Sequence, residues 1–380
     1  MRLRLVLGLA LVISGFGSIL PAAAFETAAK AAIILDNRTG AVLFEKNADE
    51  RMPPASMSKL MTAYLIFDQI KSGRLKLGEE ILVSERAWKM GGSQMFVKVG
   101  DRVKVEDLIR GIIIQSGNDA CVTMAEAIAG SEEAFAQAMT EKALELGLTG
   151  STFANATGLD DPNHLMTVRD LAILARRIIQ DFPEYFKYYG EKEFAYAGIK
   201  QPNRNPLLQA GVPGVDGMKT GFTNGAGYGL VATAERDDRR IIAVLSGLES
   251  AGQRRTEGAK LLEYGFREFQ EYRLFEPGVS VIDTGVWQGV APTVPVVVPE
   301  LVAVTLSREA RKDLVVKLNY LSPVPAPIVA GERIGQAEVS APGLAPITAP
   351  LLAGNDVARA GALARLTSNL GYLIWGEPAG

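Results

Sequence analysis

Three short polar motifs follow one another along this chain of 380 residues, and they constrain its fold more than any other feature. They are Ser56-Met57-Ser58-Lys59, Ser116-Gly117-Asn118 and Lys219-Thr220-Gly221. At average residue usage Ser-x-x-Lys occurs roughly once in a chain of this length, whereas the ordered triple arises by chance on the order of a per cent or less. A fold that uses them together must join three segments that lie far apart in the sequence.

The first motif pairs a nucleophile with a base. Ser56 and Lys59 are three residues apart at the head of an expected helix, so their side chains share one face. That helix is largely apolar and therefore buried. Burial, the positive helix N-terminus and the nearby Lys219 cation are expected to lower the pKa of Lys59. A neutral Lys59 amine can take the proton of Ser56 during attack on a carbonyl, although alone the motif equally fits a capping serine followed by an ordinary lysine.

The second motif lies in a turn between two apolar helical runs. Asn118 offers both a donor and an acceptor, and Ser116 can pass a proton between Lys59 and a leaving group. Taken alone, the tripeptide would be a helix-capping turn. Its place after the first motif indicates a second element of one active site.

The third motif precedes a strand. Lys219 and Thr220 on an edge strand can bind a substrate carboxylate, and Gly221 lets a ligand approach the backbone closely. The backbone N–H groups of Phe222 and Ser56 can together form an oxyanion hole. Taken alone, this tripeptide would be a hairpin turn. The three motifs together predict a serine acyl-transfer site with lysine as the proton carrier.

Composition excludes several other mechanisms. The single histidine, His164, lies in a loop of turn formers without a Gly-x-Ser-x-Gly elbow, and we expect it to bond the backbone. The single cysteine, Cys121, lies in an apolar helical run and is expected in the core. A zinc site needs more than one such ligand, so the sequence predicts no metal and no cofactor. The net charge of -3 provides no positive electrostatic field that would attract nucleic acid.

The order of apolar patterns predicts an α/β fold with an antiparallel sheet flanked by helices. One hairpin is expected at 31–44 and a second at 228–245. Between and after them, helical spacing is expected at 60–70, 105–114, 121–129, 134–146, 167–180 and 256–269. A sheet built from both ends of this segment, with helices inserted between, is a layered domain.

Beyond Glu276-Pro277-Gly278 the composition changes to short Val-rich runs separated by Pro and Gly. These runs, at 279–281, 294–298, 302–306, 313–318 and 334–339, predict a small all-β domain. The expected division is a signal peptide at 1–24, a catalytic domain at 25–273, a β-rich domain at 274–352 and an amphipathic tail at 353–380.

Both ends of the chain suggest export. Arg2 and Arg4 precede an apolar stretch that ends in Pro21 and three alanines, which favours a cleaved signal peptide over an uncleaved anchor. The run Val357 to Trp375 places leucines on one helical stripe, typical of an interfacial membrane helix, the alternative being a helix packed on its own protein. We therefore expect a periplasmic protein attached peripherally to the outer face of the cytoplasmic membrane.

With these motifs the chain resembles the D-alanyl-D-alanine carboxypeptidases, which are low-molecular-mass penicillin-binding proteins of the serine β-lactam-recognising superfamily. The similarity extends from about Phe25 to Phe269 and is carried by the three motifs with their neighbours and by Glu191–Phe194 and Asn203–Asn205. It implies a β-lactamase/transpeptidase-like fold, removal of the terminal D-alanine from peptidoglycan stem peptides, and inhibition by β-lactams. The β-rich segment and tail match the usual C-terminal additions of the family.

The resemblance also implies roles for individual residues. Ser56 would be the acylated nucleophile, Lys59 the proton acceptor, and Ser116 and Asn118 the second catalytic element. Lys219, with Thr220 and Gly221, would bind substrate, and Arg254 or the neighbouring Arg255 would hold the terminal carboxylate. Many relatives have His where this chain has Phe222; the oxyanion role needs only the backbone N–H and is retained.

Two other functions compete. A class A β-lactamase has Ser-Asp-Asn and a deacylating Glu, whereas this chain has Gly117 and no Glu-x-x-Leu-Asn segment after it. A non-catalytic peptidoglycan-binding envelope protein would retain a relict site, but here all catalytic positions are intact.

Overall fold

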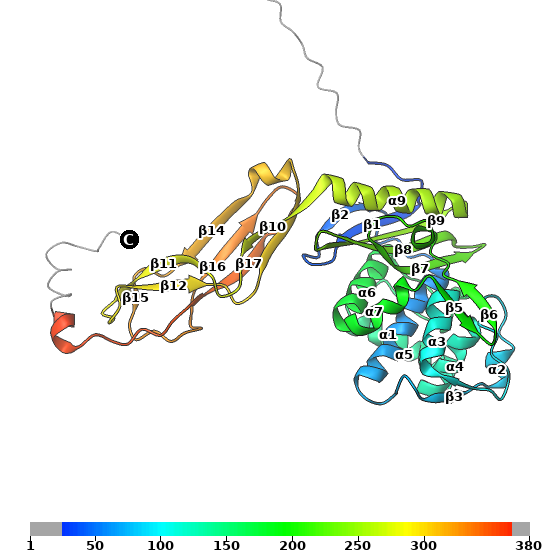
Figure 1. The fold of residues 1–380 in the computed structure, drawn as a ribbon. Helices are drawn as coiled ribbons and strands as arrows, with labels where there is room; N and C mark the ends of the chain where they lie inside the picture. Colours follow the sequence, from blue (N-terminus) through cyan, green and yellow to red (C-terminus); the bar gives the residue numbers. More distant parts are fainter. Residues whose placement is uncertain (1–24, 367–380) are drawn as a thin grey trace, which may run out of the picture.

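The computed structural model describes residues 25–366, and the N-terminal part is built on a five-stranded antiparallel sheet (Figure 1). Its strand order is β2-β1-β9-β8-β7. The strands are β1 (Ala31–Asp36), β2 (Val42–Lys46), β7 (Val215–Thr223), β8 (Gly227–Arg236) and β9 (Arg239–Leu248). Both predicted hairpins are confirmed. Strand β1 pairs with β9, so the two hairpins, which lie at opposite ends of the N-terminal part, form one sheet. Every residue of β1 is buried, as expected of an apolar strand covered on both faces.

The helices from α1 to α7 cover one face of this sheet, and a long helix covers the other (Figure 1). The first group comprises α1 (Lys59–Lys71), α2 (Glu85–Trp88), α3 (Val105–Arg110), α4 (Asn118–Ala129), α5 (Glu132–Glu145), α6 (Val168–Asp181) and α7 (Pro183–Gly190). The short helix α8 (Pro206–Gln209) packs against the long helix instead, because its Leu207 belongs to the apolar core on that side. Helix α9 (Ala251–Glu268) lies on the opposite face. One apolar core fills the space between the sheet and the helix group, and a smaller one lies under α9.

Two of the predicted helices need a physical explanation for the difference between their expected and observed bounds. The run expected at 105–114 is divided, because α3 ends at Arg110 and a π-helical turn follows at Gly111–Gln115. Helix α9 begins at Ala251, five residues before the expected start at 256, because the Ser250 side chain accepts a hydrogen bond from the Gln253 N–H and caps it.

Two short hairpins were not predicted. They are β3 (Glu80–Leu82) with β4 (Arg102–Lys104), and β5 (Glu193–Tyr196) with β6 (Ile199–Pro202). Each strand has only three or four residues, which is too short for an alternating apolar pattern to identify it in the sequence.

The C-terminal unit is all β, as expected. Strand β10 (Phe269–Phe275) follows α9 directly and pairs with β13 (Val302–Ser307). The six-stranded sheet has the order β14-β16-β17-β12-β11-β15. Its strands are β11 (Ser280–Trp287), β12 (Thr293–Val297), β14 (Val315–Tyr320), β15 (Val324–Pro325), β16 (Arg333–Ser340) and β17 (Ile347–Ala353). β10 therefore crosses the boundary expected after residue 273, and β17 ends one residue past 352.

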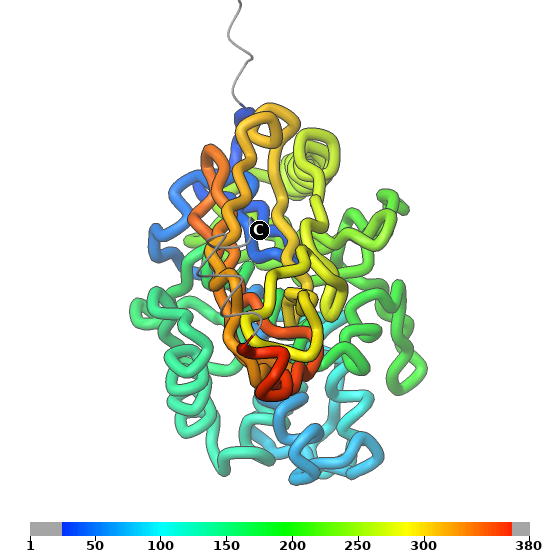
Figure 2. The backbone as a smooth tube through the Cα atoms, turned by 90° about the vertical axis from the view of Figure 1, so that its left-hand side faces the viewer, coloured from blue at the N-terminus to red at the C-terminus, as the bar shows by residue number. Residues whose placement is uncertain are grey.

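The two units meet at the β1–β2 turn. Arg38 forms ion pairs with Asp238 at 3.0 Å and with Glu271 of β10 at 3.1 Å. The hydroxyls of Thr39 and Thr305 lie 2.9 Å apart. Figure 2 views the molecule from the end that carries the β unit, which there lies in front of the N-terminal part.

The tail departs from prediction at its start. Val357 bridges to Ile328 and Arg359 to Gly289, so this segment is extended along the β unit instead of helical. Val357 is buried there and therefore belongs to the β core. A helical turn follows at 362–366, with Leu363 and Leu366 exposed by 77% and 58%. The rest of the predicted stripe, at 370–375, and the predicted signal peptide lie outside the described residues.

No helix within residues 25–366 is long and apolar enough to cross a membrane.

Candidate active site

Ser56 lies on a tight 3₁₀ turn, Ala55–Ser58, that leads into α1. Ala55 has φ +48°, a left-handed conformation that costs energy in a residue other than glycine. The turn is pressed against β7: a Cβ on Gly221 would lie 2.8 Å from the Pro54 carbonyl oxygen. Glycine at 221 therefore permits the close approach of the edge strand to the Ser56 backbone.

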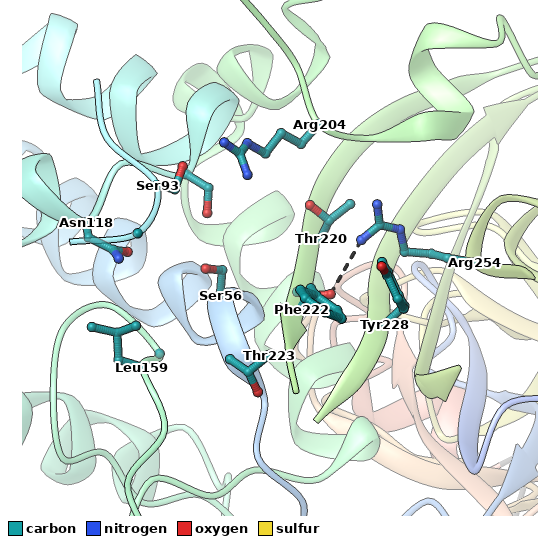
Figure 3. A pocket seen from close by; sticks show the side chains of 14 residues that line it. Ser56, Ser93, Asn118, Leu159, Arg204, Thr220, Phe222, Thr223, Tyr228 and Arg254 are labelled. Carbon is teal, nitrogen blue, oxygen red and sulfur yellow. Dashed lines mark hydrogen bonds between the residues drawn. The ribbon is translucent and has the colours of Figure 1, made fainter. Parts of the chain in front are cut away.

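Ser56 is half-buried at the floor of a cleft of about 470 Å³. Figure 3 shows it between Asn118 and Leu159 on one side and Thr220 and Phe222 on the other. The cleft is also lined by Gly92, Ser93, Ser116, Gly158, Arg204, Gly221, Thr223, Tyr228 and Arg254. Residues of all three motifs thus meet in one cavity.

The ammonium nitrogen of Lys59 has three oxygen partners. Its Nζ lies 2.8 Å from Ser56 Oγ, 2.8 Å from Asn118 Oδ1 and 2.6 Å from the carbonyl oxygen of Thr157. The side chain is 1% exposed. The predicted contact between Ser56 and Lys59 is therefore present, and Asn118 contacts the same lysine nitrogen.

Burial lowers the pKa of Lys59 to about 8, and the positive charge of Arg204 acts in the same direction. The sequence predicted burial as the main cause. It also named Lys219 as a nearby cation, and the charges of Lys59 and Lys219 do act on each other; Arg204 is a further cation that the sequence did not predict. At pH 7 about a tenth of the Lys59 side chains are then neutral.

Ser116 follows the π-helical turn at Gly111–Gln115 and has φ +67°. This conformation ends the turn and turns the chain toward β7. Ser116 Oγ accepts a hydrogen bond from Lys219 Nζ at 2.9 Å. Lys219 also bonds the carbonyl of Thr220 at 3.2 Å and is 2% exposed. Its ammonium therefore lies behind Ser116 and does not line the cleft directly.

Asn118 and its neighbour anchor the loop that forms the opposite wall. The Asn118 Nδ2 donates to the Gly91 carbonyl at 2.8 Å. The buried Asp119 carboxylate accepts hydrogen bonds from the N–H groups of Met95, Phe96 and Val97. These bonds hold the wall and leave Asn118 Oδ1 directed at Lys59.

Two arginines line the cleft beside β7 (Figure 3). Arg254 donates from Nη1 to the Gly221 carbonyl at 3.4 Å, whereas its neighbour Arg255 is exposed on α9 and does not line the cleft. Arg204 was not predicted as a site residue. The Asn203–Asn205 segment contributes to the family resemblance, but a single arginine in the sequence does not indicate that its side chain lines the cleft.

His164 and Cys121, which the sequence analysis excluded from catalysis, have the environments that it predicted. His164 Nδ1 accepts a hydrogen bond from the Ala154 N–H at 3.3 Å, and burial lowers the pKa of His164 to about 4. Cys121 is buried in the core, and burial raises the pKa of its thiol to about 12, so it is not a thiolate nucleophile.

Comparisons with known proteins show which sequences and folds this chain is similar to. The family model described as D-alanyl-D-alanine carboxypeptidase matches residues 19–250, and that of the penicillin-binding protein 5 C-terminal domain matches residues 269–359. D-alanyl-D-alanine carboxypeptidase DacC of Escherichia coli strain K12 is 42% identical over 314 residues, covering 81% of this chain and 78% of that protein. DacF of Bacillus subtilis strain 168 is 33% identical over 353 residues, covering 90% and 89%. Penicillin binding protein 5 from Haemophilus influenzae matches with a TM-score of 0.79 at 35% identity, covering 88% of this chain and 98% of that chain.

Proposed function

The chain belongs to the D-alanyl-D-alanine carboxypeptidase family of low-molecular-mass penicillin-binding proteins, and from this premise we propose how its cleft carries out the reaction. The protein is a serine-type carboxypeptidase that acts in peptidoglycan remodelling. Its substrate is a stem peptide that ends in D-Ala-D-Ala, and its product is that peptide without the last D-alanine.

The observation that carries the mechanism is the set of partners around Lys59 Nζ. A neutral amine has two N–H bonds and one lone pair. Asn118 Oδ1 and the Thr157 carbonyl can only accept, so they take the two N–H groups. The lone pair is left for the Ser56 hydroxyl, 2.8 Å away. The site thus orients the neutral lysine as a base toward its nucleophile.

The reaction follows from this arrangement. Ser56 Oγ attacks the carbonyl carbon between the two D-alanines, and its proton passes to Lys59. The N–H groups of Ser56 and Phe222 stabilise the resulting oxyanion. The C–N bond then breaks, the leaving amine receives a proton through Ser116, and a peptidyl ester remains on Ser56. Water hydrolyses this ester and restores the free hydroxyl. Lys219, which donates a hydrogen bond to Ser116 Oγ, is placed to support that proton transfer.

The terminal carboxylate should be recognised by Thr220 and Arg254, which line the cleft on the β7 side. Amidation of that carboxylate is therefore expected to lower kcat/KM for D-alanine release by roughly two decades, since a charge-assisted contact to an anion is worth on the order of 2–3 kcal/mol. Arg254→Ala should cause a similar loss on the free acid and little further loss on the amide. Arg255→Ala, altered one residue along the same helix, is the matched control.

Steady-state release of D-alanine or its amide measures these rates and separates the competing functions. Equal rates on acid and amide, or a loss with Arg255→Ala in place of Arg254→Ala, would contradict the carboxylate assignment. A β-lactamase would turn over penicillin many times and leave the peptide almost untouched. A relict binding protein would do neither. Without a deacylating Glu segment we expect penicillin to remain as an inhibitory ester on Ser56.

We further propose export, with a catalytic unit that ends with α9, a β-rich unit that begins with β10 and includes Val357, and a tail from residue 361 that rests on the outer face of the cytoplasmic membrane. The exposed Leu363 and Leu366 support an apolar stripe on that tail. Deletion of 361–380 is expected to move the mature protein from the membrane to the soluble fraction and to leave peptidase activity unchanged. Cutting after Ala360 retains the Val357 and Arg359 bridges of the β unit. Equal solubility of both forms on fractionation would refute the attachment.

A further inference from the structure

Three side chains form a stack along the β7 side of the cleft (Figure 3). The rings of Phe222 and Tyr228 lie 4.2 Å apart at an angle of 33°. The guanidinium carbon of Arg254 lies 5.4 Å from the centre of the Tyr228 ring. The tyrosine ring thus contacts both an aromatic neighbour on β7 and the cation of α9.

Few other groups fix the position of that guanidinium. Arg254 takes part in none of the ion pairs formed within residues 25–366. Its Nη1 makes one long bond of 3.4 Å, to the Gly221 carbonyl, and its buried Nε has no hydrogen-bond partner among the described residues. A long arginine side chain without a carboxylate partner loses considerable rotamer entropy when it is held in one place. The Tyr228 ring supplies the attraction that compensates for this loss, through the ring quadrupole and contact area.

The backbone keeps the stack in register. Phe222 and Tyr228 are directly opposite each other in the β7–β8 pair, and Gly227 and Tyr228 open β8 right after the turn. Tyr228 also pairs with Leu248 of β9, two residues before Ser250, which caps α9. The same short region therefore positions both the ring and the helix end that carries Arg254.

We propose that Tyr228 is a positioning residue, whose ring holds the Arg254 guanidinium where the terminal carboxylate of the substrate arrives. The Phe222 ring packs against the Tyr228 ring and supports its position. This inference rests on the proposed function, because the carboxylate belongs to that substrate. Tyr228 itself acts through Arg254 and needs its ring, not its hydroxyl.

The test compares Tyr228→Leu with Tyr228→Phe. Leucine fills similar space without a quadrupole, whereas phenylalanine retains the stacked ring. Tyr228→Leu is expected to lower kcat/KM for the free-acid peptide about tenfold, mainly by raising KM, and to change the amidated peptide by less than about twofold. Tyr228→Phe is expected to restore the wild-type ratio between the two peptides. Melting temperatures of both variants show whether they are folded.

A second measurement does not depend on activity. In the wild type and in Tyr228→Phe, ring currents should shift the Arg254 Nε–H signal in ¹H–¹⁵N spectra, and Tyr228→Leu should remove that shift. Equal losses on acid and amide, a Tyr228→Phe variant that behaves like Tyr228→Leu, or an unmoved Nε–H signal would overturn the proposal. If the wild type releases no D-alanine, the proposed function fails, while the Nε–H signal still decides whether Tyr228 positions Arg254.

Discussion

Ser56→Ala is expected to abolish covalent labelling by penicillin, with a fall in acylation rate of at least about four decades. Ser56 is the hydroxyl that lies within hydrogen-bond distance of Lys59 Nζ in the cleft, and its removal leaves no oxygen to form the ester. Intact-protein mass spectrometry should show one added penicilloyl group on the wild type and none on the variant. Peptide mapping should place that group on Ser56.

Ser58 provides the matched control for this experiment. It lies two residues along in the same turn and is buried, and its hydroxyl has no hydrogen-bond partner among the described residues. Ser58→Ala should therefore label at close to the wild-type rate. Full labelling of folded Ser56→Ala, or a penicilloyl group mapped to another residue, would exclude Ser56 as the nucleophile.

Much of the fold was predictable because its signals are local. The apolar run of β1 and the turn residues that follow it identify a hairpin without any knowledge of the rest of the molecule. The division of the helix at Gly111 is different. The π-helical turn forms where Ser116 must reach Lys219 of β7, a contact between segments far apart in the chain, so helical spacing cannot reveal it. The tail shows the same limit, since Val357 has helical spacing but its pairing with Ile328 makes it extended.

The residues of the site also fall into two groups, those that the local sequence predicts and those that only the folded chain brings together. Ser56 and Lys59 are adjacent on one turn, so their spacing alone predicted their contact, and the motifs supplied Asn118. The Thr157 carbonyl could not be predicted, because a backbone oxygen leaves no mark in the sequence. Arg204 lies in a segment that resembles the family but carries no recognisable chemistry, and Tyr228 lies in a segment without a motif, so neither was predicted to line the cleft. Lys219 was predicted as a substrate binder from its motif, but only the folded chain reveals that its ammonium donates to Ser116 Oγ.

Lys59→Arg is expected to lower the rate of acylation by at least about three decades in a protein that remains folded. A guanidinium cannot lose its proton in the accessible pH range, so it cannot serve as the base. Stopped-flow acylation with labelled penicillin measures the rate, and thermal unfolding reports on the fold. Lys71→Arg makes the same substitution at the exposed end of the same helix and should leave the rate unchanged.

The pH dependence of the wild type tests the same base without a substitution. The neutral amine is the active form, and the pKa of Lys59 is lowered to about 8, so the protonated fraction grows as the pH falls below that value. Acylation kcat/KM, which reports the free enzyme, should therefore rise by nearly tenfold per pH unit below about 7 and level off above about 9. A lysine with its ordinary pKa would still show rising rates between pH 9 and 10. Continued rise in that interval, a flat profile between pH 6 and 8, or a folded Lys59→Arg protein that acylates at the wild-type rate would each rule out the lysine-base mechanism.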